Sequence, residues 1–273
     1  FSTWGWLNAR STLHVAEGQL DETVARQHLV CAALPDGHTV AVLQFAVADH
    51  RAYVADIKGL GLIIPNDLFN EMTRTYCFET GERTLAGCPG TAETVPLTSN
   101  WVSVDNCLGV ISVYGGTGLA VVRPAERQVG LKSDDIPHKA RGGGMLYADE
   151  ICNTYMSGTR VCAQDEVLLD SGFLVVTGLD AAEIQAHSLL LQAQYRQPVA
   201  ASRARAAIIP GVDGNTYLLA ANFSGSPTDV TDLGDTLKQA VDVATGQALE
   251  PRPENGKLTC APNSARLLRI QPD

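Results

Sequence analysis

The segment from Trp101 to Pro124 reads WVSVDNCLGVISVYGGTGLAVVRP and is typical of paired β-strands. Two β-rich runs, Leu108 to Tyr114 and Leu119 to Val122, flank the four residues Gly115-Gly116-Thr117-Gly118. Because glycine tolerates positive φ, this composition predicts a β-hairpin with its turn at the glycines. Polar and apolar residues alternate from 101 to 105, which predicts a third strand in the same sheet. The centre of the chain is therefore interpreted as a β-meander.

Short apolar runs separated by turn residues continue on both sides of this segment. Pro35-Asp36-Gly37-His38 is a strong turn signal between two apolar runs, and Gly81 lies between the β-rich runs 73–78 and 83–85. Pro65 has no N–H to donate, so it ends a strand. The spacing of roughly 8 to 12 residues between turns is typical of a sandwich or barrel. No alternation of strands and helices is visible, so we expect an all-β fold.

One helix is expected, near residues 180–196. Asp180 is a suitable N-cap, and Glu183 stands at the position that completes a capping box. Pro198 follows the helix and stops it. A mostly apolar stripe at helical spacing is formed by Ile184, His187, Leu191 and Tyr195.

The stretch QPVAASRARA, Gln197 to Ala206, is the best candidate for a boundary. Beyond it come short β-rich runs separated by GVDGN, GSPTD, ATGQ and PENG. We therefore predict a large antiparallel β-sandwich over residues 1–197 and a smaller β-sandwich over residues 205–273.

Charge and composition exclude several classes of function. The chain has 273 residues, with 30 acidic and 20 basic side chains and a net charge of −10. This balance argues against binding to nucleic acid or to an anionic membrane, and it is compatible with neutral sugars or cations. No stretch approaches the roughly 18 consecutive apolar residues of a transmembrane helix. The six histidines show no HxH, HExxH or HxxxH spacing, so neither a metal site nor a cofactor is expected.

Seven cysteines are present, and two pairs are close in sequence. Cys77 and Cys88 lie on either side of a turn, and Cys152 and Cys162 bracket a loop, so at least one disulfide is expected. None of the spacings is the CxxC of a zinc knuckle or a thioredoxin-like site. The odd number leaves at least one thiol free.

The polar, glycine-rich segment after Pro124 contains the histidine with the strongest claim to chemistry. This segment is either a functional excursion from the fold or a set of edge strands with weak sequence signals. Within it, His138 stands beside Lys139, Arg141 and three glycines, although a solvent-facing histidine is the simpler interpretation. The adjacent carboxylates Asp149 and Glu150 would point to opposite faces of a strand, so they do not form an acid/base pair. No complete catalytic signature is present.

A polar cluster follows Pro65 and offers groups that suit sugars. Amides, a guanidinium and a phenol are the usual donors and acceptors for sugar hydroxyls, and a tryptophan can stack on a pyranose face. The alternative is a capped turn with solvated side chains. The candidate sugar-binding residues are Asn66, Asn70, Arg74, Tyr76 and Trp101.

The order of these features resembles a known group of enzymes. A long β-rich run through Gly178 contains WVSVDNCLGVISVYG, and a small terminal sandwich follows with TYLLAANFSG and NSARLLRI. This order resembles the β-supersandwich and C-terminal small β-sandwich of polysaccharide-processing enzymes, the lyases and glycoside hydrolases with an α/α-toroid. In such lyases a histidine or tyrosine of the sandwich can join the active site, and the resemblance implies His138 or Tyr147 for that role.

The first residues, FSTWGWL, contain no initiator Met and no secretory signal pattern, so a processed product or the downstream part of a longer chain is expected. Together with the resemblance, this predicts the downstream β-sandwich part of a secreted polysaccharide-processing enzyme, lyase or hydrolase. It would contribute to a sugar-binding cleft, with the catalytic machinery mostly in an upstream domain or a second chain. The alternative is a stand-alone carbohydrate-binding or surface-structural module without catalysis. A self-sufficient hydrolase is a third, weaker possibility.

Overall fold

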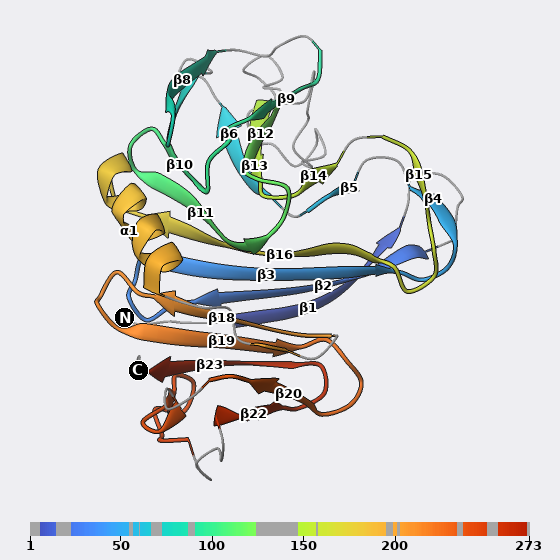
Figure 1. Ribbon diagram of the computed structural model, residues 1–273. Coiled ribbons are helices and arrows are strands. Elements are labelled where there is room, and N and C mark those ends of the chain that lie inside the picture. The colour runs from blue at the N-terminus through green and yellow to red at the C-terminus, as the bar shows by residue number, and fades with distance from the viewer. Residues whose placement is uncertain are drawn as a thin grey trace, which may run out of the picture.

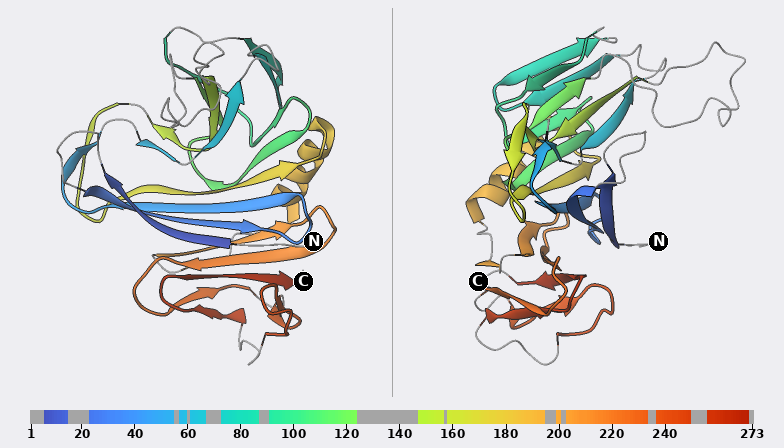
Figure 2. Two further views of the ribbon diagram at one scale, coloured as in Figure 1. Left: turned by 180° about the vertical axis from the view of Figure 1, so that it is seen from behind. Right: turned by 90° about the vertical axis from the view of Figure 1, so that its right-hand side faces the viewer.

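The structure of the chain, a computed structural model, is a stack of antiparallel β-sheets with one α-helix (Figure 1). The all-β prediction is confirmed. Figure 2 shows the same stack from behind and from the side. The residues that the structure describes are 6–14, 23–54, 57–59, 61–66, 73–86, 91–123, 147–156, 158–194, 199–200, 203–233, 237–249 and 256–271.

An eight-stranded sheet forms the centre of the stack, with the strand order β1-β2-β3-β16-β11-β10-β7-β8. Every neighbouring pair in it is antiparallel. The predicted hairpin around Gly81 is present as β7 and β8. The bounds are β1 (Trp6–His14), β2 (Thr23–Ala33), β3 (Thr39–Ala48), β16 (Val167–Thr177), β11 (Leu108–Gly115), β10 (Trp101–Val104), β7 (Thr73–Phe78) and β8 (Gly81–Ala86).

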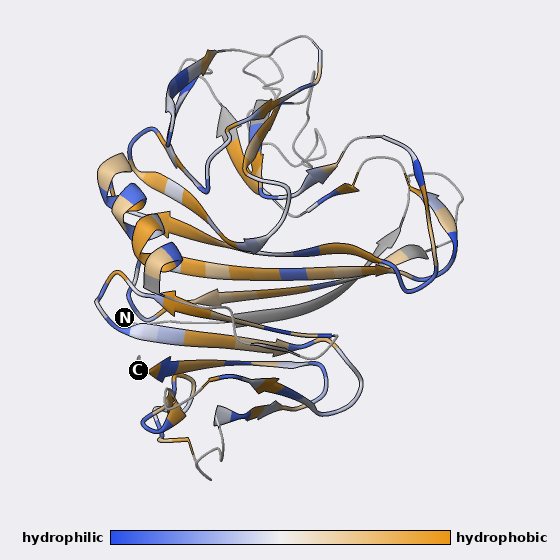
Figure 3. Ribbon diagram, in the orientation of Figure 1, coloured by the Kyte–Doolittle hydropathy of each residue, from blue (hydrophilic) through white to orange (hydrophobic). Residues whose placement is uncertain are grey.

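The central sheet is buried on both faces, and the sequence of β3 shows why. Successive side chains of a strand point to opposite faces, so TVAVLQFAVA carries apolar groups in both directions. Leu43 and Phe45 belong to the hydrophobic core on one face, whereas Val42 belongs to the core on the other. The orange colouring of β3 and β16 in Figure 3 reflects this hydrophobicity on both faces.

A four-stranded sheet covers one face of the central sheet. Its order is β6-β13-β12-β9, from Leu62–Asn66, Tyr147–Cys152, Ala120–Arg123 and Glu93–Pro96. The core between the two sheets includes Val102, Val110 and Val121. Pro65, which is expected to end a strand, lies inside β6 and is paired with Ala148. β6 is an edge strand, where proline is tolerated. Two two-stranded ribbons are separate from this sheet, β5 (Ile57–Lys58) with β14 (Tyr155–Met156) and β4 (Ala52–Val54) with β15 (Arg160–Cys162). Val54 and Cys162 of the second ribbon pack against β3 and β16.

The other face is covered by helix α1 (Ala181–Gln194) and a second four-stranded sheet. That sheet has the order β18-β19-β23-β21, from Ala204–Pro210, Thr216–Asn222, Ser264–Ile270 and Val241–Asp242. A three-stranded sheet packs on its far side, with β17 (Val199–Ala200), β20 (Thr228–Thr231) and β22 (Leu258–Cys260). One hydrophobic core therefore joins Val30 and Phe45 to Tyr217 and Leu267, across the predicted boundary at 197–206. The division into two domains stays a prediction.

The predicted helix and its capping box are confirmed. The Asp180 backbone N–H donates to Glu183 Oε2 at 2.8 Å, and the Glu183 N–H donates to Asp180 Oδ1 at 2.8 Å. Ile184, His187 and Leu191 are buried against the sheets, as the stripe predicts. The His187 ring bonds the backbone of Pro210, and its Nε2 has no hydrogen-bond partner among the described residues. Burial lowers the pKa of His187, although the Asp36 charge and the Pro210 bond act in the opposite direction.

The predicted hairpin at Gly115–Gly118 is wrong. These residues carry the chain from the central sheet, where β11 pairs with β10 and β16, into the next sheet, where β12 pairs with β9 and β13. The expected positive φ is present, at 62° for Gly115 and 75° for Gly116. The actual hairpin joins β10 to β11 through Asp105 and Asn106, with φ of 50° and 56°. The third predicted strand, β10, does lie in the sheet of β11.

The expected disulfides are not present among the described cysteines. Six of the seven are described, and all six are free. Cys152 is buried in β13, and Cys162 packs beside β3 and β16 in a separate hydrophobic cluster, so the two do not meet. Cys77 is free, and Cys88 lies outside the described residues. Burial raises the pKa of Cys152 to about 11, so its thiol stays protonated and unreactive at neutral pH.

We expect Gly116→Ala to destabilise the fold more than Gly37→Ala. Both glycines have a φ of 75°, so both variants carry the cost of a left-handed alanine, about 1 kcal/mol. A Cβ at residue 116 would also lie 2.1 Å from the Asn153 carbonyl oxygen, whereas a Cβ at residue 37 meets nothing. The clash should add roughly 1–3 kcal/mol, measured by urea denaturation of both variants. Equal losses would contradict the close approach at residue 116.

The buried His187 should make the fold less stable at acidic pH. Its pKa is lower in the folded chain than its ordinary value of 6.5, so the unfolded chain binds the proton more readily. The contribution is fully present above about pH 6.5 and is lost as the pH falls toward the folded pKa, by at most about 1.4 kcal/mol per pH unit. His187→Gln removes this part of the pH dependence. Parallel pH profiles of unfolding free energy for wild type and variant would contradict it.

Candidate functional site

Four polar residues mark one end of the β6-β13-β12-β9 sheet, and we call this end the sheet rim. Asn66 of β6 lies opposite Tyr147 of β13, and Arg123 of β12 lies opposite Glu93 of β9. The register therefore makes neighbours of Asn66 and Tyr147, two predicted site residues that are 81 positions apart in the sequence (147 minus 66). The tertiary structure collects at this rim residues that the sequence places far apart.

A chain of polar contacts starts at the rim and crosses between two sheets, and all of its members except Glu93 are buried. Asp149 is 0% exposed and accepts a hydrogen bond from the Tyr76 hydroxyl at 2.6 Å and from Arg123 Nε at 3.3 Å. Arg123 Nη1 in turn donates to Glu93 Oε1 at 2.6 Å. We call these four residues the Asp149 network. It joins Tyr76 in β7 of the central sheet to one side chain from each of β13, β12 and β9 in the covering sheet.

The Asp149 network keeps one of its members, the Tyr76 phenol, protonated. Burial raises the pKa of Tyr76, and the negative charge of Asp149 raises it further, so the phenol remains a neutral donor. A buried carboxylate is costly unless it is paired and hydrogen-bonded, and Arg123 and Tyr76 supply both conditions. The network therefore suits the positioning of the rim better than proton transfer.

Two predicted sugar contacts lie inside the protein. Tyr76 is 0% exposed, and its hydroxyl already donates to Asp149. Trp101 is 6% exposed and belongs to the core on the α1 side of the central sheet. In this structure neither ring has a face open to a ligand, because β7 and β10 are interior strands covered on both sides.

Of the other predicted residues, Arg74 lies in β7 of the central sheet, and two lie in parts of the chain without a description. Arg74 is half-buried and forms an ion pair with Asp105, whose Oδ1 also accepts from the Thr75 N–H at 2.9 Å. Asn70 and His138 lie outside the described residues. The segments that contain them, 67–72 and 124–146, follow Asn66 and Arg123 directly in the sequence.

The sequence alone does not assign a role to Arg123, Glu93 or Asp149. The one signal in it is the pair Asp149 and Glu150, which is expected to point to opposite faces of a strand. That expectation is confirmed, since Asp149 faces Tyr76 whereas Glu150 forms an ion pair with Lys58. Arg123 and Glu93 come from separate strands, and only the sheet register reveals their pairing.

Neither a membrane helix nor a metal cluster is found in the described part of the chain. The single described helix is neither long nor apolar enough to cross a bilayer. Among the residues with a description, no three His, Cys, Asp or Glu side chains are grouped so that they could hold a metal ion.

Comparison with known proteins finds a distant structural neighbour. No protein-family model matches the chain, and no curated protein matches it. The fold is similar to a solved structure of the Streptomyces coelicolor A3 chondroitin AC lyase in complex with chondroitin sulphate. The TM-score is 0.35 and the sequence identity is 13%, over 99% of this chain and 35% of the lyase chain. This chain therefore spans about a third of that lyase's length.

We expect Tyr76→Phe to destabilise the protein and Tyr114→Phe to leave it unchanged or more stable. Removing the Tyr76 hydroxyl takes a hydrogen bond from the buried Asp149 carboxylate, which costs roughly 1–3 kcal/mol. The Tyr114 hydroxyl is buried without a partner among the described residues, so its removal relieves an unsatisfied group. Urea denaturation measures both effects. Similar changes in the two variants would contradict a stabilising role for the Asp149 network.

Proposed function

We propose that this chain is the β-sandwich part of a secreted polysaccharide-processing enzyme and that the sheet rim contributes to its sugar-binding cleft. The observation that supports the proposal best is the register that sets Asn66 beside Tyr147, with Arg123 and Glu93 on the next two strands. An amide, a phenol, a guanidinium and a carboxylate are the groups that bind sugar hydroxyls.

The rim is also held rigidly, which favours binding. The Asp149 network fixes Arg123 and anchors β13 to the central sheet through Tyr76. A binding group that is already in place loses little conformational entropy when a ligand arrives. The net charge of −10 favours a sugar without many negative charges over a polyanion.

We propose further that most of the catalytic machinery comes from an upstream segment or a second chain. Around the rim, the described ionisable side chains are committed to partners: Arg123 to Glu93 and Asp149, and Arg74 to Asp105. A general base needs an accessible group near its working pKa, and a carboxylate in an ion pair is a poor one. His138 and Tyr147 remain the candidates from the resemblance for a catalytic contribution by this chain.

The alternative proposal is a carbohydrate-binding module without catalysis. The pairing of Arg123 with Glu93 and Asp149 favours this alternative, since charges held in ion pairs position a ligand without reacting with it. The two proposals differ in whether a partner domain restores turnover of a polysaccharide.

Asn66→Ala and Arg74→Ala should each weaken the binding of an oligosaccharide to this chain. Losing a hydrogen bond from a sugar costs roughly 1–3 kcal/mol for a charged donor and about 1 kcal/mol for an amide. Calorimetric titration with trisaccharides of several polysaccharides measures the change. Arg160→Ala, on the distant ribbon β4–β15, is the matched control and should bind like wild type.

Unchanged binding in both Asn66→Ala and Arg74→Ala would overturn the proposed sugar cleft. Turnover of polysaccharide by the isolated chain, followed as new reducing ends, would overturn the proposal that the catalytic machinery lies elsewhere.

A further inference from the structure

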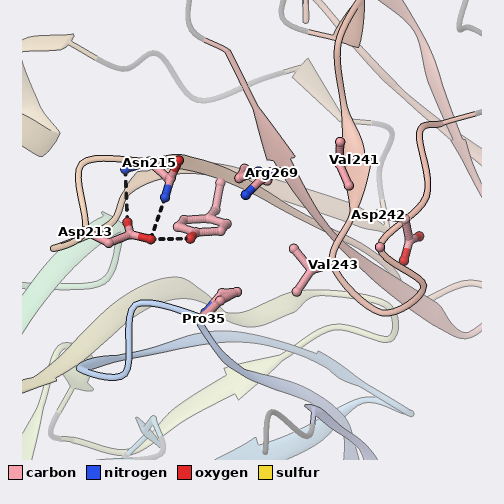
Figure 4. A pocket seen from close by; sticks show the side chains of 9 residues that line it. Pro35, Asp213, Asn215, Val241, Asp242, Val243 and Arg269 are labelled. Carbon is pink, nitrogen blue, oxygen red and sulfur yellow. Dashed lines mark hydrogen bonds between the residues drawn. The ribbon is translucent and has the colours of Figure 1, made fainter. Parts of the chain in front are cut away.

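A pocket of about 240 Å³ opens where the C-terminal sheet meets the turn before β3 (Figure 4). Pro35 forms one wall, and the turn between β18 and β19 with the strand ends of β21 and β23 forms the rest. The pocket is smaller than the roughly 300–1,000 Å³ that holds a drug-sized ligand, so its size suits a single ring. Its polar lining includes Asp213, Asn215, Asp242 and Arg269.

Arg269 occupies a position where the sheet pattern calls for an apolar residue. Ala265 and Leu267 precede it on the same face of β23, and both belong to the core against the central sheet. In register, Arg269 lies between Tyr217 of β19 and Val241 of β21. Its side chain is exposed and makes no hydrogen bond or ion pair with any residue that the structure describes. Five N–H donors are therefore available at the pocket.

Acceptors face the pocket from the β18–β19 turn. Asp213 accepts from the Asn215 backbone N–H at 3.0 Å, from Asn215 Nδ2 at 2.6 Å and from the Tyr217 hydroxyl at 2.8 Å (Figure 4). Burial acts to raise the pKa of Asp213, but the bonds from Asn215 and Tyr217 outweigh it and hold the pKa below its ordinary value. Asp213 is thus ionised at neutral pH. Its own backbone N–H is a fourth donor to the carboxylate, so the Asn215 side-chain oxygen is the acceptor that remains for a ligand.

The charges around the pocket balance. Asp242 is paired with Arg266, with 2.9 Å between Oδ2 and Nη2. The remaining two charges, Asp213 and Arg269, have opposite signs. Apolar side chains of Pro35, Val241 and Val243 complete the lining. A neutral ligand with hydroxyl groups on an apolar ring fits this combination, because the charges of the lining already cancel.

The two walls of the pocket are fixed to each other. Asp36, next to Pro35, accepts a hydrogen bond from the Val212 N–H at 3.1 Å through Oδ2, and its Oδ1 accepts from the N–H groups of His38 and Thr39 at 2.9 Å each. The bond from Val212 joins turns that are 176 residues apart. The pocket is therefore formed before any ligand arrives, which lowers the entropy cost of binding.

We propose that this pocket binds one neutral pyranose unit, with Arg269 donating to sugar hydroxyls and the Asn215 side-chain oxygen accepting from one of them. This sugar site depends on the pocket's own groups and is separate from the function proposed for the sheet rim. It adds a second sugar-binding position, in the C-terminal sheet, to the chain.

The test compares Arg269→Gln with wild type in titrations monitored by the backbone amide NMR signals of Asn215 and Gly246, both at the pocket. The probes are maltotriose, cellotriose and mannotriose as neutral ligands, and trigalacturonate as an acidic one. At least one neutral trisaccharide should shift these signals. Arg269→Gln should lower the affinity for that trisaccharide on the order of tenfold to a hundredfold. Because Arg269 is exposed, the variant should keep the wild-type circular dichroism spectrum.

Two control variants separate this site from the rim. Arg160→Gln replaces another exposed arginine far from the pocket and should bind like wild type. Asn66→Ala changes the rim and should leave the pocket signals unaffected. The pocket proposal can therefore hold even if sugar binding at the rim fails. Unchanged affinity in Arg269→Gln, no shift with any neutral trisaccharide, or tighter binding of trigalacturonate would each overturn the proposal.

Discussion

The fold depends on the burial of both faces of the central eight-stranded sheet. β3 and β16 present apolar side chains in both directions, so neither face can be left to water. One face is covered by the β6-β13-β12-β9 sheet, and the other by α1 and the β18-β19-β23-β21 sheet. The order of layers follows from that requirement, and so do the positions of the sheet rim and of the pocket at the C-terminal sheet.

Within this apolar stack, the Asp149 network places a buried carboxylate between two sheets. A buried carboxylate close to two hydrophobic layers is costly, and it is tolerated because Tyr76 and Arg123 donate to it from both sheets. Its physical effect is to fix the register and the distance of the two sheets near the rim. A sheet end held this way can present side chains to a polysaccharide without moving.

The rim and the pocket lie on opposite sides of the central sheet and belong to different covering sheets. The rim is built by residues of the first two-thirds of the chain, and the pocket mainly by the C-terminal strands. A polymer that is held at two positions dissociates more slowly than one held at either alone, provided that its length spans both.

The sequence by itself determined the local structure: the all-β class, the hairpin at Gly81, the positive φ of Gly115 and Gly116, and the capping box of Asp180 and Glu183. Each of these depends on residues within a few positions of one another, where steric limits and local hydrogen bonds decide. Only the tertiary structure decided that β11 and β12 enter different sheets, that Tyr76 and Trp101 are buried, and that Cys152 and Cys162 do not pair. It also brought Asn66 to Tyr147 and Asp36 to Val212. Alternating apolar and polar residues predict a strand but not the strand with which it pairs, because pairing between distant strands is set by which faces must be covered.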